Sequence, residues 1–254
     1  MSRIDDESRL DANQAAMGFD RLWHLQHAEF TRGIGAVTPM LQGLVEYCQT
    51  NGFTRVIEGG SGPGYHAFFM ASHGLEVMGI EHSSEAIEVA WDNLGELNGR
   101  IHVDRKIEFV QGDFVAGLET RKAEEAGLVG GVYANALLHF FDQPTRLRVY
   151  KAGYDVLSPG GMMAVSFKSS RDALRNLGEV VGRELAGLVV NDSKYYNLGI
   201  KRLFVEDPQP LMAEMSGVGF KVLAPLEWVA KHYNAGGHYG DGYFVGLVGI
   251  KPGA

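Results

Sequence analysis

Residues 54–64 read TRVIEGGSGPG, an apolar run that ends in an acid, Glu58, and continues into a loop with glycine at positions 60, 62 and 64. The residues that follow, YHAFFMA at positions 65–71, predict a helix. A strand, a glycine turn and a helix in this order place the loop at the carboxyl end of a parallel sheet, where doubly wound folds bind ligands. Glycine suits such a loop because it accepts positive φ and lets the backbone approach a ligand closely.

The spacing of these glycines narrows the kind of ligand. A dinucleotide-binding fingerprint requires G-x-G-x-x-G, but the position three after Gly62 is Tyr65. A phosphate-binding P-loop ends in Gly-Lys-Ser/Thr before its helix, and the run contains no such sequence. The spacing is instead E-x-G-x-G-x-G. A glycine loop alone is a weak signal, and a tight turn without a ligand stays open as an alternative.

Alternating strand and helix patterns predict a parallel sheet with right-handed crossovers. The predicted strands span residues 54–58, 75–81, 106–110, 131–135 and 161–167. Before the first strand, Thr38 and Pro39 predict the start of a helix, with threonine as N-cap and proline at the first helical position. The order of these elements predicts an α/β fold.

Acidic residues follow the second and third predicted strands. Glu81 ends the second strand, and Asp113 comes directly after Gly112 at the end of the third. A carboxylate in the position of Glu81 suits the two vicinal hydroxyls of a ribose, because it accepts two hydrogen bonds at once. The alternatives are a solvated strand-end carboxylate for Glu81 and an Asx turn for Asp113.

Together with Leu-Ser-Pro-Gly-Gly at positions 157–161, these ordered features resemble the class I S-adenosylmethionine (SAM) dependent methyltransferases, in their small-molecule branch. The resemblance covers residues 54–168 well, the C-terminal part fairly and the first fifty residues hardly at all. It implies a doubly wound, seven-stranded, mostly parallel sheet with a C-terminal antiparallel hairpin and helical cap elements. It also implies SAM as methyl donor and S-adenosylhomocysteine (SAH) as product.

The resemblance further implies which residues surround the donor. The loop after Glu58 would hold the amino-acid end, Glu81 the ribose and Asp113 the exocyclic amine of adenine. Phe114 either packs against the adenine plane or belongs to the core. The residues expected to bind the donor are Glu58, Gly59, Gly60, Gly62, Gly64, Glu81, His82, Gly112, Asp113, Phe114 and Asn135.

His139 is the candidate catalytic base. It follows the fourth predicted strand, where substrate and sulfonium meet in the methyltransferases it resembles. Histidine titrates near neutrality and can take a proton from a hydroxyl or an amine. The alternative is that His139 only shapes the pocket. Asn135 is not part of an Asn-Pro-Pro-Tyr motif, which argues against the branches that methylate adenine in DNA or glutamine.

The chain is predicted to form one domain of four parts. Residues 1–52 are expected to be an N-terminal helical cap, 53–168 the SAM-binding core, 169–208 a cap insertion and 209–254 the C-terminal part of the sheet. The first half of the insertion is expected to be helical, from Leu174, Leu177, Val181 and Leu185. Aromatic residues of both caps are expected to bind the substrate or to seal the caps to the core, and they are Trp23, His27, Tyr195 and Tyr196.

Composition narrows the partners and the compartment. The net charge is −8 and no stretch is rich in Lys or Arg, so nucleic acid is not a predicted partner, whereas a basic protein stays open. A single cysteine, Cys48, excludes an internal disulfide and fits the reducing cytoplasm. No apolar run is long enough for a membrane span, so no membrane partner is expected. No metal site is predicted, because the histidines at positions 24, 27 and 66 lack a carboxylate at ligand spacing. A homodimer is left open.

The sequence therefore predicts SAM-dependent methylation of a small molecule, on oxygen or nitrogen in preference to carbon. The alternatives are methylation of a protein or peptide side chain, another SAM-using reaction, and a non-catalytic SAM-binding subunit.

Overall fold

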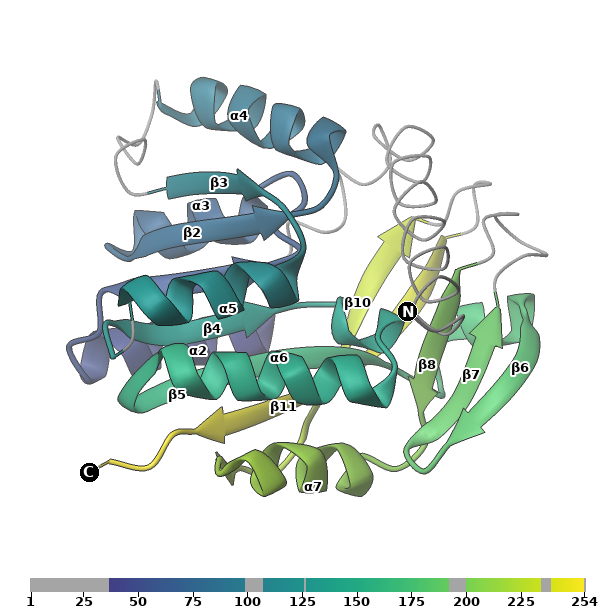
Figure 1. Ribbon diagram of the computed structural model, residues 1–254. Coiled ribbons are helices and arrows are strands. Elements are labelled where there is room, and N and C mark those ends of the chain that lie inside the picture. The colour runs from purple at the N-terminus through teal and green to yellow at the C-terminus, as the bar shows by residue number, and fades with distance from the viewer. Residues whose placement is uncertain (1–36, 99–106, 126, 192–199, 234–238, 254) are drawn as a thin grey trace, which may run out of the picture.

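A twisted sheet with helices on both faces forms the centre of the protein (Figure 1). The computed structural model describes residues 37–98, 107–125, 127–191, 200–233 and 239–253. Five parallel strands lie in the order β3-β2-β1-β4-β5. They are β1 (Arg55–Gly59), β2 (Glu76–Glu81), β3 (Ile107–Gln111), β4 (Val129–Ala134) and β5 (Leu157–Ser169). All five predicted strands are confirmed, and so is the α/β class.

The strand order reverses between β1 and β4, and this reversal positions the site. The chain runs outward from β1 to β2 and β3, then returns to place β4 on the other side of β1. Consecutive connections therefore leave the sheet in opposite directions at this point, which is where doubly wound sheets bind their ligands. The glycine loop follows β1, so it lies at this point.

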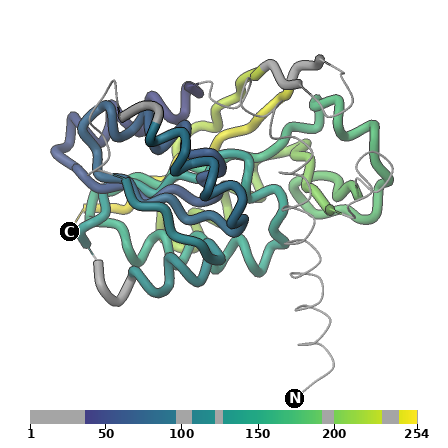
Figure 2. Tube along the Cα trace, turned by 90° about the horizontal axis from the view of Figure 1, so that it is seen from above, coloured from purple at the N-terminus to yellow at the C-terminus, as the bar shows by residue number. Residues whose placement is uncertain are grey.

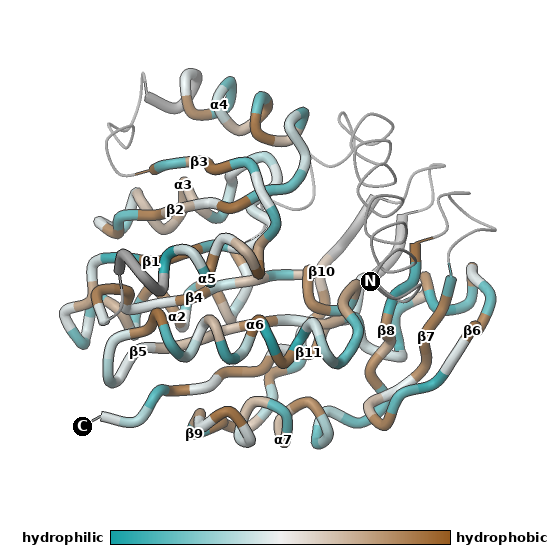
Figure 3. Tube along the Cα trace, in the orientation of Figure 1, coloured by the Kyte–Doolittle hydropathy of each residue, from teal (hydrophilic) through white to brown (hydrophobic). Residues whose placement is uncertain are grey.

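Helices cover both faces of the sheet because successive strand residues point to opposite sides. Val56 and Tyr133 belong to one hydrophobic cluster, and their neighbours Ile57 and Val132 belong to the other. The first cluster includes residues of α2 (Pro39–Thr50), α3 (Tyr65–Ser72) and α4 (Ser84–Asn98). The second includes residues of α5 (Phe114–Glu125), α6 (Gln143–Val156) and α7 (Gln209–Val218). In Figure 3 the turns of α6 alternate between hydrophilic and hydrophobic colours, as expected when only one face packs on the sheet.

The beginning of α2 confirms the predicted capping. The Thr38 hydroxyl accepts a hydrogen bond from the Leu41 amide at 3.1 Å, and Pro39 opens the helix. Thr38 also contacts the Tyr133 hydroxyl on β4, with 3.2 Å between the two oxygens. Cys48 is fully buried on this helix, and burial raises the pKa of its thiol to about 12.

The far side of β5 carries the C-terminal strands. β11 (Tyr239–Ile250) runs antiparallel to β5 and also pairs with β10 (Leu226–Tyr233) and β9 (Lys221–Val222). The predicted C-terminal antiparallel hairpin is confirmed. Burial alternates along β10, since Trp228 is buried against Phe244 while the next residue, Val229, is exposed.

The first half of the insertion, residues 169–208, is not helical as predicted. The stretch expected to be helical forms the 3₁₀ turn η3 (Ala173–Leu177) and then a strand, β6 (Glu179–Glu184). Two further strands follow, β7 (Gly187–Asn191) and β8 (Lys201–Val205), and β8 pairs in parallel with the end of β5. The apolar residues at helical spacing do not form a buried face, since Leu177, Val181 and Leu185 are 36, 46 and 86% exposed. Consecutive β-branched residues favour the strand instead.

These three strands enlarge the sheet at the end opposite β3 (Figures 1 and 2). The described part of the chain contains an 11-stranded sheet, so the predicted number of seven is wrong. Three of the four additional strands are the inserted ones, and the fourth arises because β9 and β10 pair with β11 as separate strands. None of the described helices is both long and apolar enough to cross a membrane.

A buried arginine joins the inserted strands to the helices. Arg146 on α6 is 1% exposed and donates to Glu184 on β6 at 2.6 Å and to both carboxylate oxygens of Glu214 on α7. It also donates to the Phe141 carbonyl oxygen at 2.8 Å. One guanidinium therefore holds two helices and the inserted hairpin together.

Candidate active site

The glycine loop after β1 has a backbone conformation that residues with a Cβ could adopt only with strain. Gly60, Gly62 and Gly64 have φ values of 65°, 51° and 81°. A Cβ on Gly64 would also lie 2.7 Å from the Phe109 ring. The loop therefore needs glycine both for its φ angles and for its packing.

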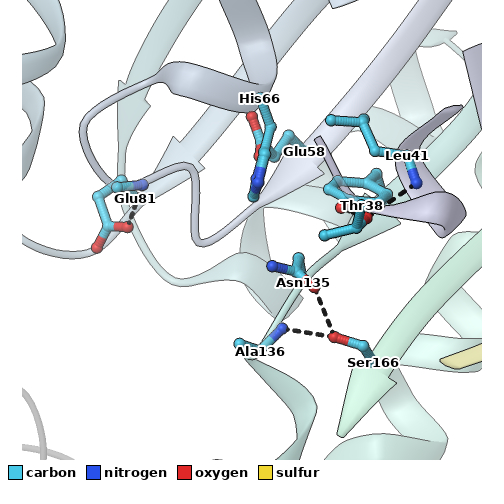
Figure 4. Close-up of polar contacts among 10 residues, drawn as sticks. Thr38, Leu41, Glu58, His66, Glu81, Asn135, Ala136 and Ser166 are labelled. Carbon is cyan, nitrogen blue, oxygen red and sulfur yellow. Dashed lines mark hydrogen bonds and ion pairs between the residues drawn. The ribbon is translucent and has the colours of Figure 1, made fainter. Parts of the chain in front are cut away.

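Glu81 holds the glycine loop against β2 (Figure 4). One carboxylate oxygen accepts from the Gly62 amide at 2.9 Å, and the other accepts from the Ser83 amide at 2.9 Å. Burial raises the pKa of this carboxyl, and the bonds from the Ser83 and Gly62 amides oppose that shift. Each oxygen keeps a second lone pair that could accept from a ribose hydroxyl. The contact with the loop is seen in the structure, and the contact with a ribose stays a prediction.

Replacing Glu81 with alanine is expected to weaken SAM binding by about 1.5–3 kcal/mol, or roughly 10- to 150-fold in Kd. The variant loses the charged acceptor of two amides, so the Gly62 end of the loop loses its side-chain anchor, while the backbone bond from Gly60 to Ile80 remains. Calorimetric titration measures the effect, with Glu76→Ala as control, because Glu76 lies on the same strand with its side chain 56% exposed. Unchanged SAM affinity together with a collapsed melting temperature would show that Glu81 is only structural.

Glu58 and His66 form a buried pair beside the loop (Figure 4). Glu58 is 1% exposed, and one of its oxygens lies 3.2 Å from His66 Nδ1. Burial raises the pKa of Glu58, and the hydrogen bond and charge of His66 oppose that shift. The other Glu58 oxygen and His66 Nε2 are buried without hydrogen-bond partners. Unsatisfied buried polar atoms are costly, and these two fit a charged ligand end such as the amino acid of SAM.

The residues predicted to surround adenine mainly contact other parts of the protein chain. Asp113 is exposed and accepts from the Ala116 amide at 2.8 Å, which starts α5. Phe114 is 4% exposed, and its ring lies so close to Gly59 that a Cβ there would be 2.5 Å from it. Phe114 belongs to the buried core, and contacts of Phe114, Asp113, Gly112 and the exposed His82 with SAM stay predictions.

The turn after β4 lies against the glycine loop. Leu137 would be 3.3 Å from a Cβ on Gly60. Asn135 is partly exposed in this turn, and its side chain is bonded to the buried Ser166 of β5 at 2.8 Å. Asn135 therefore belongs to the turn that contacts the loop through Leu137, and its contact with the donor stays a prediction.

His139 lies in the short 3₁₀ helix η2 (Leu138–Phe140), which packs on β5 and β8. It is 3% exposed, and its Nδ1 has no hydrogen-bond partner. Burial lowers its pKa well below the usual 6.5, and the positive charges of Arg202 and Lys168 lower it further. Lys168 is itself paired with Asp172 at 2.7 Å. The imidazole is therefore uncharged at neutral pH.

This pKa shift predicts acid sensitivity. Because the folded pKa of His139 lies below its unfolded value near 6.5, the unfolded chain binds the extra proton first. The contribution to stability is complete above pH ~6.5 and falls by about 1.4 kcal/mol per pH unit below it, until the folded pKa is reached. Urea unfolding of His139→Gln at pH 7, 6 and 5 should show a shallower loss than the unmodified protein. Replacing the exposed His73 with glutamine is the control, and this variant should lose stability with falling pH as steeply as the unmodified protein. An equal loss of stability in all three proteins would contradict the lowered pKa of His139.

Three contributors were not identified as site residues from the sequence. For His66 the sequence suggests only a metal-ligand role, and no sequence signal joins it to Glu58, because the contact links a helix to a strand. Tyr133, whose ring meets the His66 ring edge-on with centroids 5.5 Å apart, lies inside an apolar run. Ser166 had a usable signal, since it is the one polar residue in GMMAVSF, positions 161–167.

Four predicted substrate-binding residues, Trp23, His27, Tyr195 and Tyr196, lie outside the described residues, and their role stays a prediction. Within the described ranges, no group of three His, Cys, Asp or Glu side chains converges as a metal site would require.

Several known proteins are similar to this chain. Residues 56–161 match a family model described as a methyltransferase domain. No curated protein sequence was found to match. Among solved structures, the chain is similar to 1,6-didemethyltoxoflavin-N1-methyltransferase of Burkholderia thailandensis, with a TM-score of 0.66, 14% identity, and coverage of 96% of this chain and 90% of that one.

Two further structures are similar over most of the chain. A SAM-dependent methyltransferase of Methanosarcina mazei has a TM-score of 0.61 and 17% identity, covering 85% of this chain and 99% of its own. A glycopeptide N-methyltransferase has a TM-score of 0.56 and 21% identity, covering 85% and 98%. At these identities the structures show a shared fold.

Proposed function

We propose that this chain, whose residues 56–161 match a methyltransferase domain, is a class I SAM-dependent enzyme that methylates an oxygen or nitrogen atom of a small molecule. The observation that carries the proposal is the glycine loop at the strand-order reversal, with Glu81 fixing it and unsatisfied atoms of Glu58 and His66 beside it. Among the similar proteins, one is named for 1,6-didemethyltoxoflavin and another for a glycopeptide, so a peptide acceptor is the alternative.

SAM supplies a methyl group on a positively charged sulfur, so the protein does not need to activate the donor. Its residues must hold donor and acceptor in line, exclude water and, where the acceptor carries a proton, remove it. Glu81 and the glycine loop serve the first task. Residues with mainly structural contacts, such as Phe114, keep the loop in shape.

His139 is proposed as the proton acceptor. Its lowered pKa keeps the imidazole uncharged, which is the form a base requires, but also reduces its affinity for a proton. This combination suits acceptors whose proton is already acidic, such as a phenol or a heteroaromatic N–H, better than an aliphatic alcohol.

The function is tested by binding and then by turnover. Calorimetry should show binding of SAM and SAH but not of NAD, and NAD binding without SAM binding would exclude the assignment. Incubation with isotope-labelled SAM and metabolite pools should then release SAH and label a small molecule. Label in a peptide fraction would support the alternative acceptor, and binding without SAH release would indicate a non-catalytic subunit.

A further inference from the structure

Ser166 fixes the conformation of the turn after β4. It is fully buried on β5, and its hydroxyl oxygen accepts from the Ala136 amide at 2.8 Å. The same hydroxyl donates to Asn135 Oδ1 at 2.8 Å. Ala136 has φ 53°, and no other non-glycine residue in the described ranges has positive φ. Such a backbone is unfavourable for alanine and persists when neighbouring contacts hold it.

These bonds determine which way the Asn135 amide points. Because Ser166 already accepts from Ala136, its own hydrogen is free to donate, and Asn135 Oδ1 receives it. The reversed amide would leave the hydroxyl hydrogen of a fully buried serine without an acceptor. The Nδ2 group is therefore directed away from Ser166, as Figure 4 shows.

Asn135 faces the glycine loop from the neighbouring strand. β1 and β4 pair with Glu58 opposite Tyr133, so the residues that follow on each strand lie next to one another. The contact of Leu137 with Gly60 shows that loop and turn touch. A partly exposed N–H₂ group at this place can donate to a ligand held by the loop.

We propose that Ser166 is a positioning residue that aims the Asn135 amide at the carboxylate of the donor's amino-acid end. This inference rests on the proposed function. An amide N–H₂ group can only donate, so it suits the carboxylate and not the ammonium, and a bond to a charged acceptor is among the stronger hydrogen bonds. Glu58 has the opposite character, because its unsatisfied oxygen can only accept when ionised.

Two ligands separate the amino-acid end from the rest of the donor. SAH carries it, and 5′-methylthioadenosine keeps the adenine, ribose and sulfur but lacks it. By calorimetry, Asn135→Ala is expected to weaken SAH binding about 10- to 100-fold and to leave methylthioadenosine binding within about twofold. Asn135→Asp should weaken SAH binding further, because it places a carboxylate against a carboxylate.

Ser166→Ala should show the same selectivity with a smaller loss for SAH, about three- to tenfold, because the amide remains but is free to rotate. Ser158→Ala is the matched control, since Ser158 is also buried on β5 but lies at its other end and bonds to the Gly127 carbonyl oxygen. It should leave both affinities unchanged.

The outcomes distinguish the inference from the proposed function. If Asn135→Ala weakens the binding of SAH and methylthioadenosine equally, or weakens neither, the role of the Asn135 amide at the carboxylate is overturned. SAH binding by the unmodified protein would still support the proposed function. Failure of the unmodified protein to bind either ligand would overturn the function itself. Circular dichroism checks that each variant folds. If Ser166→Ala does not fold, the Asn135 variants still test whether the amide binds the carboxylate, because Asn135 is partly exposed and its replacement disturbs the core less.

Discussion

Replacing Arg146 with alanine is expected to lower the free energy of unfolding by about 3–5 kcal/mol, the range for removing one partner of a buried ion pair. The loss leaves Glu214, whose side chain is 8% exposed, without its bidentate partner, and Glu184 without its 2.6 Å contact. It also leaves the Phe141 carbonyl oxygen without the donor seen here. Urea unfolding followed by circular dichroism measures the change.

Arg148 provides the control on the same helix. It pairs with Glu119 at 3.0 Å, but the two side chains are 60 and 47% exposed. An exposed pair contributes little, so Arg148→Ala should change the unfolding free energy by less than about 1 kcal/mol. Equal effects of the two substitutions would show that the buried cluster does not stabilise the fold as its geometry implies.

Replacing His139 with alanine is expected to lower turnover ~10²–10⁴-fold while leaving SAH affinity nearly intact, the range for loss of a general base. The measurement uses the acceptor found in the labelling screen. In the unmodified protein, turnover should fall as the pH drops through the pKa of His139, because a protonated imidazole cannot accept a proton. Since that pKa lies below 6.5, this limb should appear on the acid side of 6.5 and be absent in the variant.

His139→Asn tests the alternative that the residue only shapes the pocket. Asparagine keeps a polar side chain of similar reach but does not titrate. Nearly full activity with an unchanged pH profile would remove His139 from the catalytic residues. It would also indicate an acceptor that is already nucleophilic, such as a thiolate or carboxylate.

The parallel half of the sheet could be predicted because its signals are local. Glu58 with its glycines, Glu81 and the Thr38–Pro39 cap each combine a residue type with a position at the end of an element. Their conformations follow from short-range sterics and capping, so they need no knowledge of distant residues.

The inserted strands and much of the site could not be predicted, because they depend on partners far along the chain. Leu174, Leu177, Val181 and Leu185 match a helical spacing, yet β6 forms a strand because it pairs with β7, which in turn pairs with β8. Similarly, Asn135 meets Ser166 only after β4 and β5 have paired, and Glu58 meets His66 only after α3 has packed on β1. Tertiary contacts override local preference at such places.

The burial of Cys48 has a practical consequence for spectroscopy. With a pKa of about 12, its thiol is almost entirely protonated at neutral pH, and thiol-directed reagents react with the exposed thiolate. A cysteine introduced at a surface position such as Leu185, which is 86% exposed, would therefore take up a maleimide probe selectively. The native chain can thus serve as the background for fluorescent or spin labels without removal of its own cysteine.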